Sequence, residues 1–180
     1  MRKIVLTFGL IAGVILSVMM LLTIPFAERI GFDKGAIIGY TTMVLAFLMV
    51  YFGVRSYRDT VAGGSVSFGQ ACKVGLLIVV IASACYVATW QFVYYRITPD
   101  FMEKYSAYTL EQARKGGASE TEIAAKAEEM AKFSEMYKNP LVNIGFTFLE
   151  PLPVGLVFTL VTAGVLSRKR RAAEPAAAMN

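Results

Sequence analysis

The sequence contains no histidine, two cysteines and a single tryptophan, and only 17% of its 180 residues are charged. Without histidine, the chain cannot build a Ser-His-Asp triad, an imidazole general base or the usual zinc and haem sites. Cys72 and Cys85 both lie in an apolar segment, at a spacing that matches no metal or redox motif, so we interpret them as small packing residues. We therefore expect no cofactor and no metal site.

Hydrophobic residues, in contrast, make up 56% of the chain. Soluble domains contain about 45–50% apolar and about 25% charged residues, so this composition is typical of a protein solvated largely by lipid. Four apolar segments each reach the roughly 20 residues that a helix needs to cross a bilayer. The sequence thus predicts an all-α integral membrane protein, a single domain with four transmembrane helices. These spans comprise residues 4–27, 35–54, 68–95 and 141–166.

One sizeable polar region, residues 96–140, separates the third apolar segment from the fourth. Thr98, which precedes a proline, is expected to cap a first helix in this region. Ser119 and Glu122 have the spacing of a capping box that starts a second helix. We therefore predict a helical hairpin between the third and fourth transmembrane helices.

Basic residues are concentrated at one end of the predicted bundle. Lysine and arginine near span ends are retained in the cytoplasm, so this asymmetry predicts that both termini are cytoplasmic. The hairpin of residues 96–140 is then extracytoplasmic, and residues 172–180 are expected to form a disordered cytoplasmic tail. The basic residues at the cytoplasmic end are Arg2, Lys3, Arg55, Arg58, Lys73, Arg168, Lys169, Arg170 and Arg171, against Asp59 and Glu174.

Glu150 is the most unusual residue in the predicted spans. A carboxyl group there costs about 2.5–3.5 kcal/mol on insertion scales, so it usually faces the bundle interior, is paired or is protonated. Pro151 and Pro153 follow it and lack a backbone N–H, which predicts a kinked or broken helix beside the carboxyl group. Tyr86 and Gln91 on the third span lie at a similar depth as candidate partners. Further candidate partners are Thr89, Trp90, Tyr94, Arg96 and Arg29.

Two interpretations of this polar site remain open. In the structural one, the prolines only kink the span and Glu150 makes a buried hydrogen bond. In the functional one, the broken helix and Glu150 line a polar cavity that serves proton or ligand transport. A polar cavity that converges on Glu150 would favour the functional interpretation, and a dry bundle with a locally bonded carboxyl group would favour the structural one.

Two pairs of glycines have a spacing that lets membrane helices approach closely. Gly9 and Gly13 lie four residues apart in the first span, and Gly35 and Gly39 do so at the start of the second. Small residues at this spacing are typical of helix contacts in membranes. The pattern predicts close packing, either within the chain or between two copies of it.

Three segments resemble a known family over nearly the whole chain. They are Phe52-Gly53-Val54-Arg55-Ser56-Tyr57-Arg58-Asp59, then Gly64-x-x-x-Phe68-Gly69-Gln70-Ala71-x-Lys73-x-Gly75, and finally Glu150-Pro151-Leu152-Pro153-Val154-Gly155. In this order they are similar to the membrane family called domain of unknown function 4199. The resemblance implies a small, multi-pass, four-span protein of the bacterial inner membrane, and it implies no activity. We interpret Tyr57, Arg58 and Asp59 as a candidate cytoplasmic contact loop.

Two functions are compatible with these features. The first is a non-catalytic accessory or scaffold protein that contacts another membrane protein or a second copy of the chain. The alternative is a small proton- or ligand-linked transport module that uses Glu150. We expect no enzymatic activity, because Ser83 or Cys85 with a distant Glu150 is a weak basis for a nucleophile and its base. The lipid bilayer is the expected partner, and nucleic acid is not, since no basic face with stacking aromatic residues is present.

Overall fold

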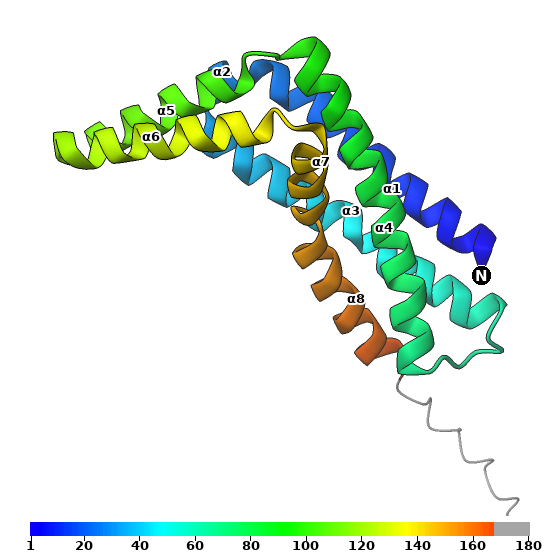
Figure 1. The fold of residues 1–180 in the computed structure, drawn as a ribbon. Helices are drawn as coiled ribbons and strands as arrows, with labels where there is room; N and C mark the ends of the chain where they lie inside the picture. Colours follow the sequence, from blue (N-terminus) through cyan, green and yellow to red (C-terminus); the bar gives the residue numbers. More distant parts are fainter. Residues whose placement is uncertain (168–180) are drawn as a thin grey trace, which may run out of the picture.

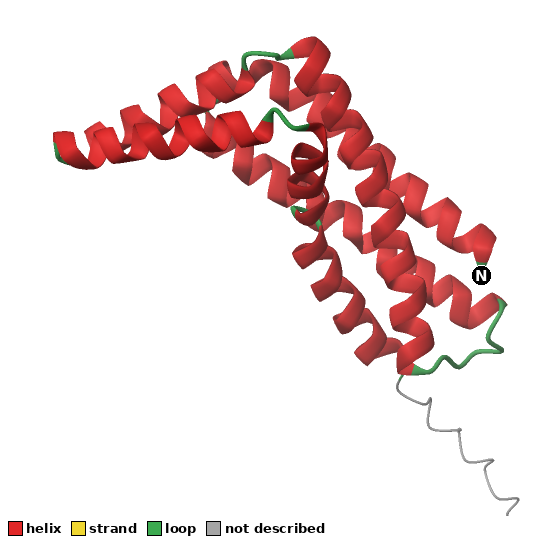
Figure 2. Ribbon diagram, in the orientation of Figure 1, coloured by secondary structure: helices red, strands yellow, loops and turns green. Residues whose placement is uncertain are grey.

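The computed structural model describes residues 1–167 and is all-helical over that range, without a β-strand (Figures 1 and 2). Four helical stretches are long and apolar enough to cross a membrane, which confirms the predicted fold class. The first contains α1 (Arg2–Thr23), η1 (Ile24–Phe26) and α2 (Ala27–Ile30), and the second is α3 (Phe32–Thr60). The third contains α4 (Phe68–Phe92) and the π-helix η2 (Val93–Ile97), and the fourth contains α7 (Pro140–Leu149) and α8 (Leu152–Leu166). The predicted tail, residues 172–180, lies outside the described residues, as do Arg168–Arg171.

Close glycine contacts hold the bundle together. A Cβ atom at Gly9 would lie 2.8 Å from Cβ of Ile81, and one at Gly13 would lie 2.7 Å from Cβ of Cys85, so α1 approaches α4 closely. This agrees with the prediction for the first span. Gly35 and Gly39 differ, because a Cβ atom at either position would meet nothing within 4 Å. The second glycine pair therefore makes no close contact with any other helix within residues 1–167.

The second span is longer than predicted at both ends. Helix α3 begins at Phe32 and continues to Thr60, so Tyr57, Arg58 and Asp59 lie in its last two turns and do not form a loop. The backbone remains helical because the long charged side chains reach water without interrupting the hydrogen-bond ladder. Asp59 supports this end, since its carboxylate lies 2.7 Å from Nε of Arg58. The connection to α4 turns instead at Gly63 and Gly64, which both have positive φ.

Helices α5 (Phe101–Lys115) and α6 (Glu120–Tyr137) form the predicted hairpin, which extends away from the bundle in Figure 1. Ser119 and Glu122 make both hydrogen bonds of a capping box. The prediction for Thr98 is wrong, because Asp100 is the N-cap of α5. The amide of Thr98 instead makes the last π-helical bond, to the carbonyl of Val93, so Thr98 is the C-cap of η2.

One ion-pair cluster ties the hairpin to the end of the first span. Nζ of Lys104 lies 2.9 Å from a carboxylate oxygen of Glu28 and 2.8 Å from one of Asp100. The hydrogen bond from Lys104 lowers the pKa of the Asp100 carboxyl below its ordinary value, and the hydrogen bonds to Asp100 and Glu28 raise the pKa of Lys104. Asp100 and Lys104 therefore stay charged at neutral pH. Next to them, Phe32 contacts the rings of Phe101, Tyr105 and Tyr108.

Candidate functional site

The fourth span is broken at Glu150. Helix α7 ends at Leu149, and α8 begins at Leu152. Pro151 has no N–H to donate and lies between the two helices, so the α-helical ladder cannot continue through it. This confirms the predicted interruption. The two halves also pack differently, since α8 contacts α3 and α4, whereas α7 contacts α4 and α6.

Polar contacts hold α7 against α4 and the hairpin. Nε2 of Gln91 donates to Oδ1 of Asn143 over 2.6 Å. Nε1 of Trp90 donates to the hydroxyl of Tyr137 over 3.0 Å. The Thr147 hydroxyl donates to the carbonyl of Asn143, so the Tyr137 hydroxyl, 3.3 Å away, donates to Thr147. These bonds fix the outer half of the fourth span on α4 and on the hairpin.

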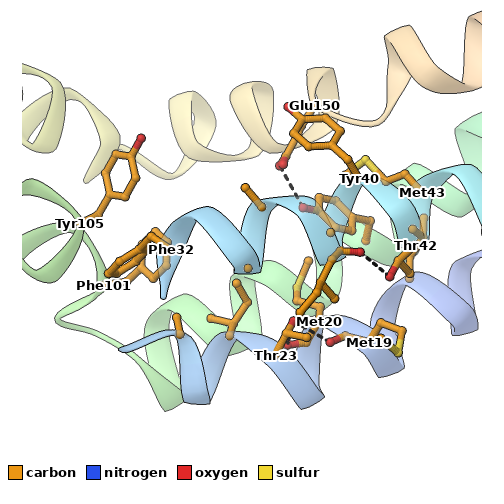
Figure 3. Close-up of a pocket in the computed structure, with 18 residues that line it drawn as sticks. Met19, Met20, Thr23, Phe32, Tyr40, Thr42, Met43, Phe101, Tyr105 and Glu150 are labelled. Atoms are coloured by element: carbon orange, nitrogen blue, oxygen red, sulfur yellow. Dashed lines mark hydrogen bonds between the residues drawn. The ribbon is translucent and has the colours of Figure 1, made fainter. Parts of the chain in front are cut away.

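A cavity of about 250 Å³ lies mainly between the end of α1 and the first half of α3, and Glu150 also lines it (Figure 3). An adjoining cavity of about 700 Å³ extends beneath the hairpin. Both have mainly apolar and aromatic walls, and they adjoin each other, because they share six lining residues. The shared residues are Ile24, Tyr40, Tyr86, Phe101, Tyr105 and Glu150. We call the two adjoining cavities together the Glu150 cavity.

Glycines and the hairpin together shape the Glu150 cavity. Gly35 and Gly39 line it from α3, and the absence of a side chain at these positions leaves the room that a larger residue would fill. Phe101 and Tyr105 of α5 cover the cavity from the hairpin side and lie near Phe32 in Figure 3. Within residues 1–167 this glycine pair therefore borders a cavity instead of a helix contact, and packing between two copies stays a prediction.

Glu150 is bonded to the third span. The hydroxyl of Tyr86 donates to Oε2 of Glu150 over 2.9 Å, the bond marked beside Glu150 in Figure 3. Glu150 lies ten residues after Pro140, about 15 Å into the span at helical rise. Its side chain is not sealed in the core, because it lines both parts of the cavity. Among residues 1–167, no basic side chain forms an ion pair with Glu150.

The structure brings together only part of the predicted site. Glu150 and Tyr86 are bonded, and Pro153 lines the larger part of the cavity beside them. Pro151 is fully buried and breaks the helix. Gln91 does not contact Glu150, because Asn143 on α7 takes its amide. The other candidate partners Thr89 and Trp90 are bonded to Ser17 and Tyr137, and neither Arg29 nor Arg96 forms an ion pair with Glu150.

Tyr57, Arg58 and Asp59 lie at the opposite end of the bundle. Arg58 and Asp59 line a groove of about 740 Å³ between the end of α3 and the start of α4, together with Ser67. Tyr57 is partly buried against the core and does not line this groove. Of the three predicted contact residues, Tyr57 therefore packs against the core, and Arg58 and Asp59 line the groove.

Three residues that matter to the cavity were missed by the sequence analysis. Tyr40 faces Glu150 from α3, and Asn143 and Thr147 fasten α7. The available signal was a polar side chain within an otherwise apolar segment. That signal indicates burial or pairing, but it does not say which helix supplies the partner.

Replacing Tyr86 by phenylalanine is expected to lower the free energy of unfolding by about 1.5 kcal/mol, because the bond to a carboxylate is lost. In a Glu150→Gln background the same replacement should cost about half as much, since the acceptor is then neutral. Unfolding by sodium dodecyl sulfate in mixed micelles measures all four proteins of this double-mutant cycle. An equal cost of Tyr86→Phe in both backgrounds would show that the pair is not energetically coupled.

The hydrogen-bonded pair of Glu150 and Tyr86 can take part in binding. A carboxyl group can exchange a proton or pair with a cation, and Tyr86 orients it by hydrogen bonding. In the described part of the chain, no group of three or more His, Cys, Asp or Glu side chains could hold a metal ion.

Comparison with known proteins gives a family and no activity. No curated protein matches the chain, and no solved structure matches it. Residues 7–168 match the family described as "Protein of unknown function (DUF4199)". This match covers the four span helices and the hairpin, and it agrees with the resemblance carried by the Tyr57-Arg58-Asp59 and Glu150-Pro151-Leu152-Pro153 segments. The chain therefore belongs to the family of membrane proteins designated DUF4199.

Proposed function

We propose that this protein is a small ligand-linked module of the membrane, which takes an apolar or amphipathic molecule into the Glu150 cavity. The observation that carries the proposal is that a large, mainly apolar cavity reaches a carboxyl group about 15 Å into a span. Its larger part, about 700 Å³, lies within the size range of small-molecule sites, and the smaller part adds about 250 Å³. A bundle that served only to anchor a partner would be expected to fill such a space with side chains.

The route into the cavity is expected to run through the bilayer. Tyr40 on α3 and Leu149 on α7 both border the cavity, and their side chains are 54% and 60% exposed. Because α7 packs mainly against α4 and α6, we expect the side of the cavity between Tyr40 and Leu149 to face the hydrocarbon region. A membrane-soluble molecule can therefore enter laterally without crossing a polar surface.

Photolabelling tests this proposal. A neutral, membrane-soluble diazirine is expected to label cavity residues such as Met20, Phe101 and Tyr105 in the wild-type protein in membranes. Gly39→Phe should reduce that labelling at least fivefold, because Gly39 lines the cavity and a side chain there meets no neighbour that would turn it away. Peptide mapping by mass spectrometry gives the labelled positions.

The matched control is Gly164→Phe. Gly164 is also a helical glycine at which a Cβ atom would meet nothing within 4 Å, but it lines neither part of the cavity. This variant should be labelled as the wild type is. Labelling confined to exposed span residues such as Leu141 and Val161 in all three proteins would contradict the proposal.

An accessory role has separate support. The α5–α6 hairpin extends away from the bundle (Figure 1), and exposed pairs such as Lys132 with Glu128 cover it. Such a polar, protruding surface is available to another membrane protein or to a second copy of the chain. Cross-linking of the intact protein followed by affinity capture tests this role. Recovery of the chain alone would remove its support.

The proposed location is the bacterial inner membrane, with both termini in the cytoplasm. The start of α1 and the end of α8 lie at one end of the bundle (Figure 1), which also carries Arg55, Arg58 and Lys73. Basic residues at this end favour the cytoplasm. A phosphatase that is active only outside the cytoplasm should be active when inserted at Gly117 in the hairpin turn and inactive when fused after Ser167. The reverse pattern would overturn the orientation.

A further inference from the structure

The charges around the Glu150 cavity are strongly one-sided. Among all residues that line its two parts, Glu150 is the only one with a carboxyl group, and none is a lysine or arginine. The other titratable side chains in the lining are tyrosines, which are neutral near pH 7. They are Tyr40 on α3, Tyr86 on α4, Tyr105 on α5 and Tyr137 on α6. The cavity can therefore carry one negative charge and no positive charge.

The Glu150 carboxyl group has capacity for a further partner. Tyr86 donates to Oε2, and no other donor within residues 1–167 bonds to either carboxyl oxygen. A carboxylate inside a span is costly unless a cation or further donors accompany it. No lysine or arginine lines the cavity to supply such a cation. A positively charged occupant would therefore offset the cost of the unpaired carboxylate.

The walls of the cavity select for an apolar body around that charge. Phe101 and Tyr105 from α5 and Tyr40 from α3 present aromatic rings to the same space that Glu150 lines. Aromatic faces attract cations, most strongly where water is excluded. An anion of the same size would be repelled by the carboxylate, and a neutral molecule would leave the charge unpaired.

Building on the proposed function, we infer that the Glu150 cavity binds a hydrophobic monocation. The ligand is an amine or onium ion whose positive charge lies at the Glu150 carboxylate and whose apolar groups contact Tyr40, Phe101 and Tyr105. Tyr86 acts as a positioning residue, because its hydroxyl holds one carboxyl oxygen and leaves the other for the ligand.

Binding of radiolabelled tetraphenylphosphonium to the purified full-length protein in micelles tests this inference. Saturable binding to the wild type is expected, and an excess of unlabelled tetraphenylphosphonium should displace the label. Tetraphenylborate, an anion of nearly the same shape, should compete at least tenfold less well. This comparison uses only the wild type, so it does not depend on the folding of any variant. Equal competition by the two ions, or no saturable binding, would overturn the inference.

Variants test whether the cation binds at the Glu150 carboxylate. Glu150→Gln should weaken tetraphenylphosphonium binding at least tenfold, Gly39→Phe should abolish it, and Gly164→Phe should leave it unchanged. Wild-type binding by Glu150→Gln would overturn the inference.

The outcomes also distinguish this inference from the proposed function. If the diazirine labels the cavity but the cation shows no preference over the anion, the inference fails and the proposed function stands. If the diazirine does not label the cavity, the proposed function itself fails.

Discussion

Replacing Gly155 by leucine should lower the free energy of unfolding by about 3 kcal/mol. A Cβ atom at Gly155 would lie 2.5 Å from Cγ1 and 3.2 Å from Cβ of Val79, so α8 could no longer approach α4. Val79 is buried and branched at Cβ, and it cannot rotate away without moving its helix. Overpacking of a filled core typically costs about 1–3 kcal/mol, and a contact that separates two helices belongs at the upper end.

Gly164→Leu on the same helix provides the matched control. It makes the same change in helix propensity, at most about 1 kcal/mol, but a Cβ atom there meets nothing within 4 Å. Its unfolding curve in a sodium dodecyl sulfate titration should therefore stay close to that of the wild type. A similar loss in both variants would mean that the close approach of α8 and α4 does not determine stability.

Replacing Phe47 by alanine is the second change with a large expected effect, again about 3 kcal/mol. Phe47 lies on α3, is fully buried and belongs to the core shared by the four spans. Truncation of a buried phenylalanine costs about 3–5 kcal/mol in soluble proteins. We expect a cost at the lower end of this range. Lipid chains are as apolar as the phenylalanine side chain, so the variant loses packing contacts but little free energy of transfer from water.

Phe52→Ala tests whether burial is the cause. Phe52 lies on the same helix and is 45% exposed, so lipid can occupy the space that its removal leaves. Its loss should change the free energy of unfolding by less than about 1 kcal/mol. An equal effect of both alanine variants in the same titration would refute the assigned role of Phe47.

Local signals in the sequence predicted local structure correctly where the decisive atoms are close along the chain. The Ser119–Glu122 box caps α6, because its hydrogen bonds join residues three positions apart. Pro151 breaks the fourth span for a similarly local reason, the missing N–H. Thr98 failed as a cap because η2 continues to Ile97 and shifts the start of α5 to Phe101.

The site was predicted only in part, because its contacts join different helices. Tyr86 was predicted as a partner of Glu150 because the two residues lie at a similar depth in the membrane. Gln91 was predicted on the same ground, but it is bonded to Asn143. Rotation about the helix axis separates the two, since residues five positions apart on α4 do not share a face. Spacing likewise could not distinguish Gly39, which opens a cavity, from Gly13, which closes a helix contact.

The sequence by itself determined the number of spans, the hairpin and the break at Glu150, because apolar length, capping residues and missing backbone donors act within one segment. Only the tertiary structure decided what surrounds Glu150. Glu150 is bonded to Tyr86 on α4 and borders two adjoining cavities, whose walls come from α1, α3, α5 and α7. Only the packing of these helices brings the walls together, because residues far apart in the sequence supply them.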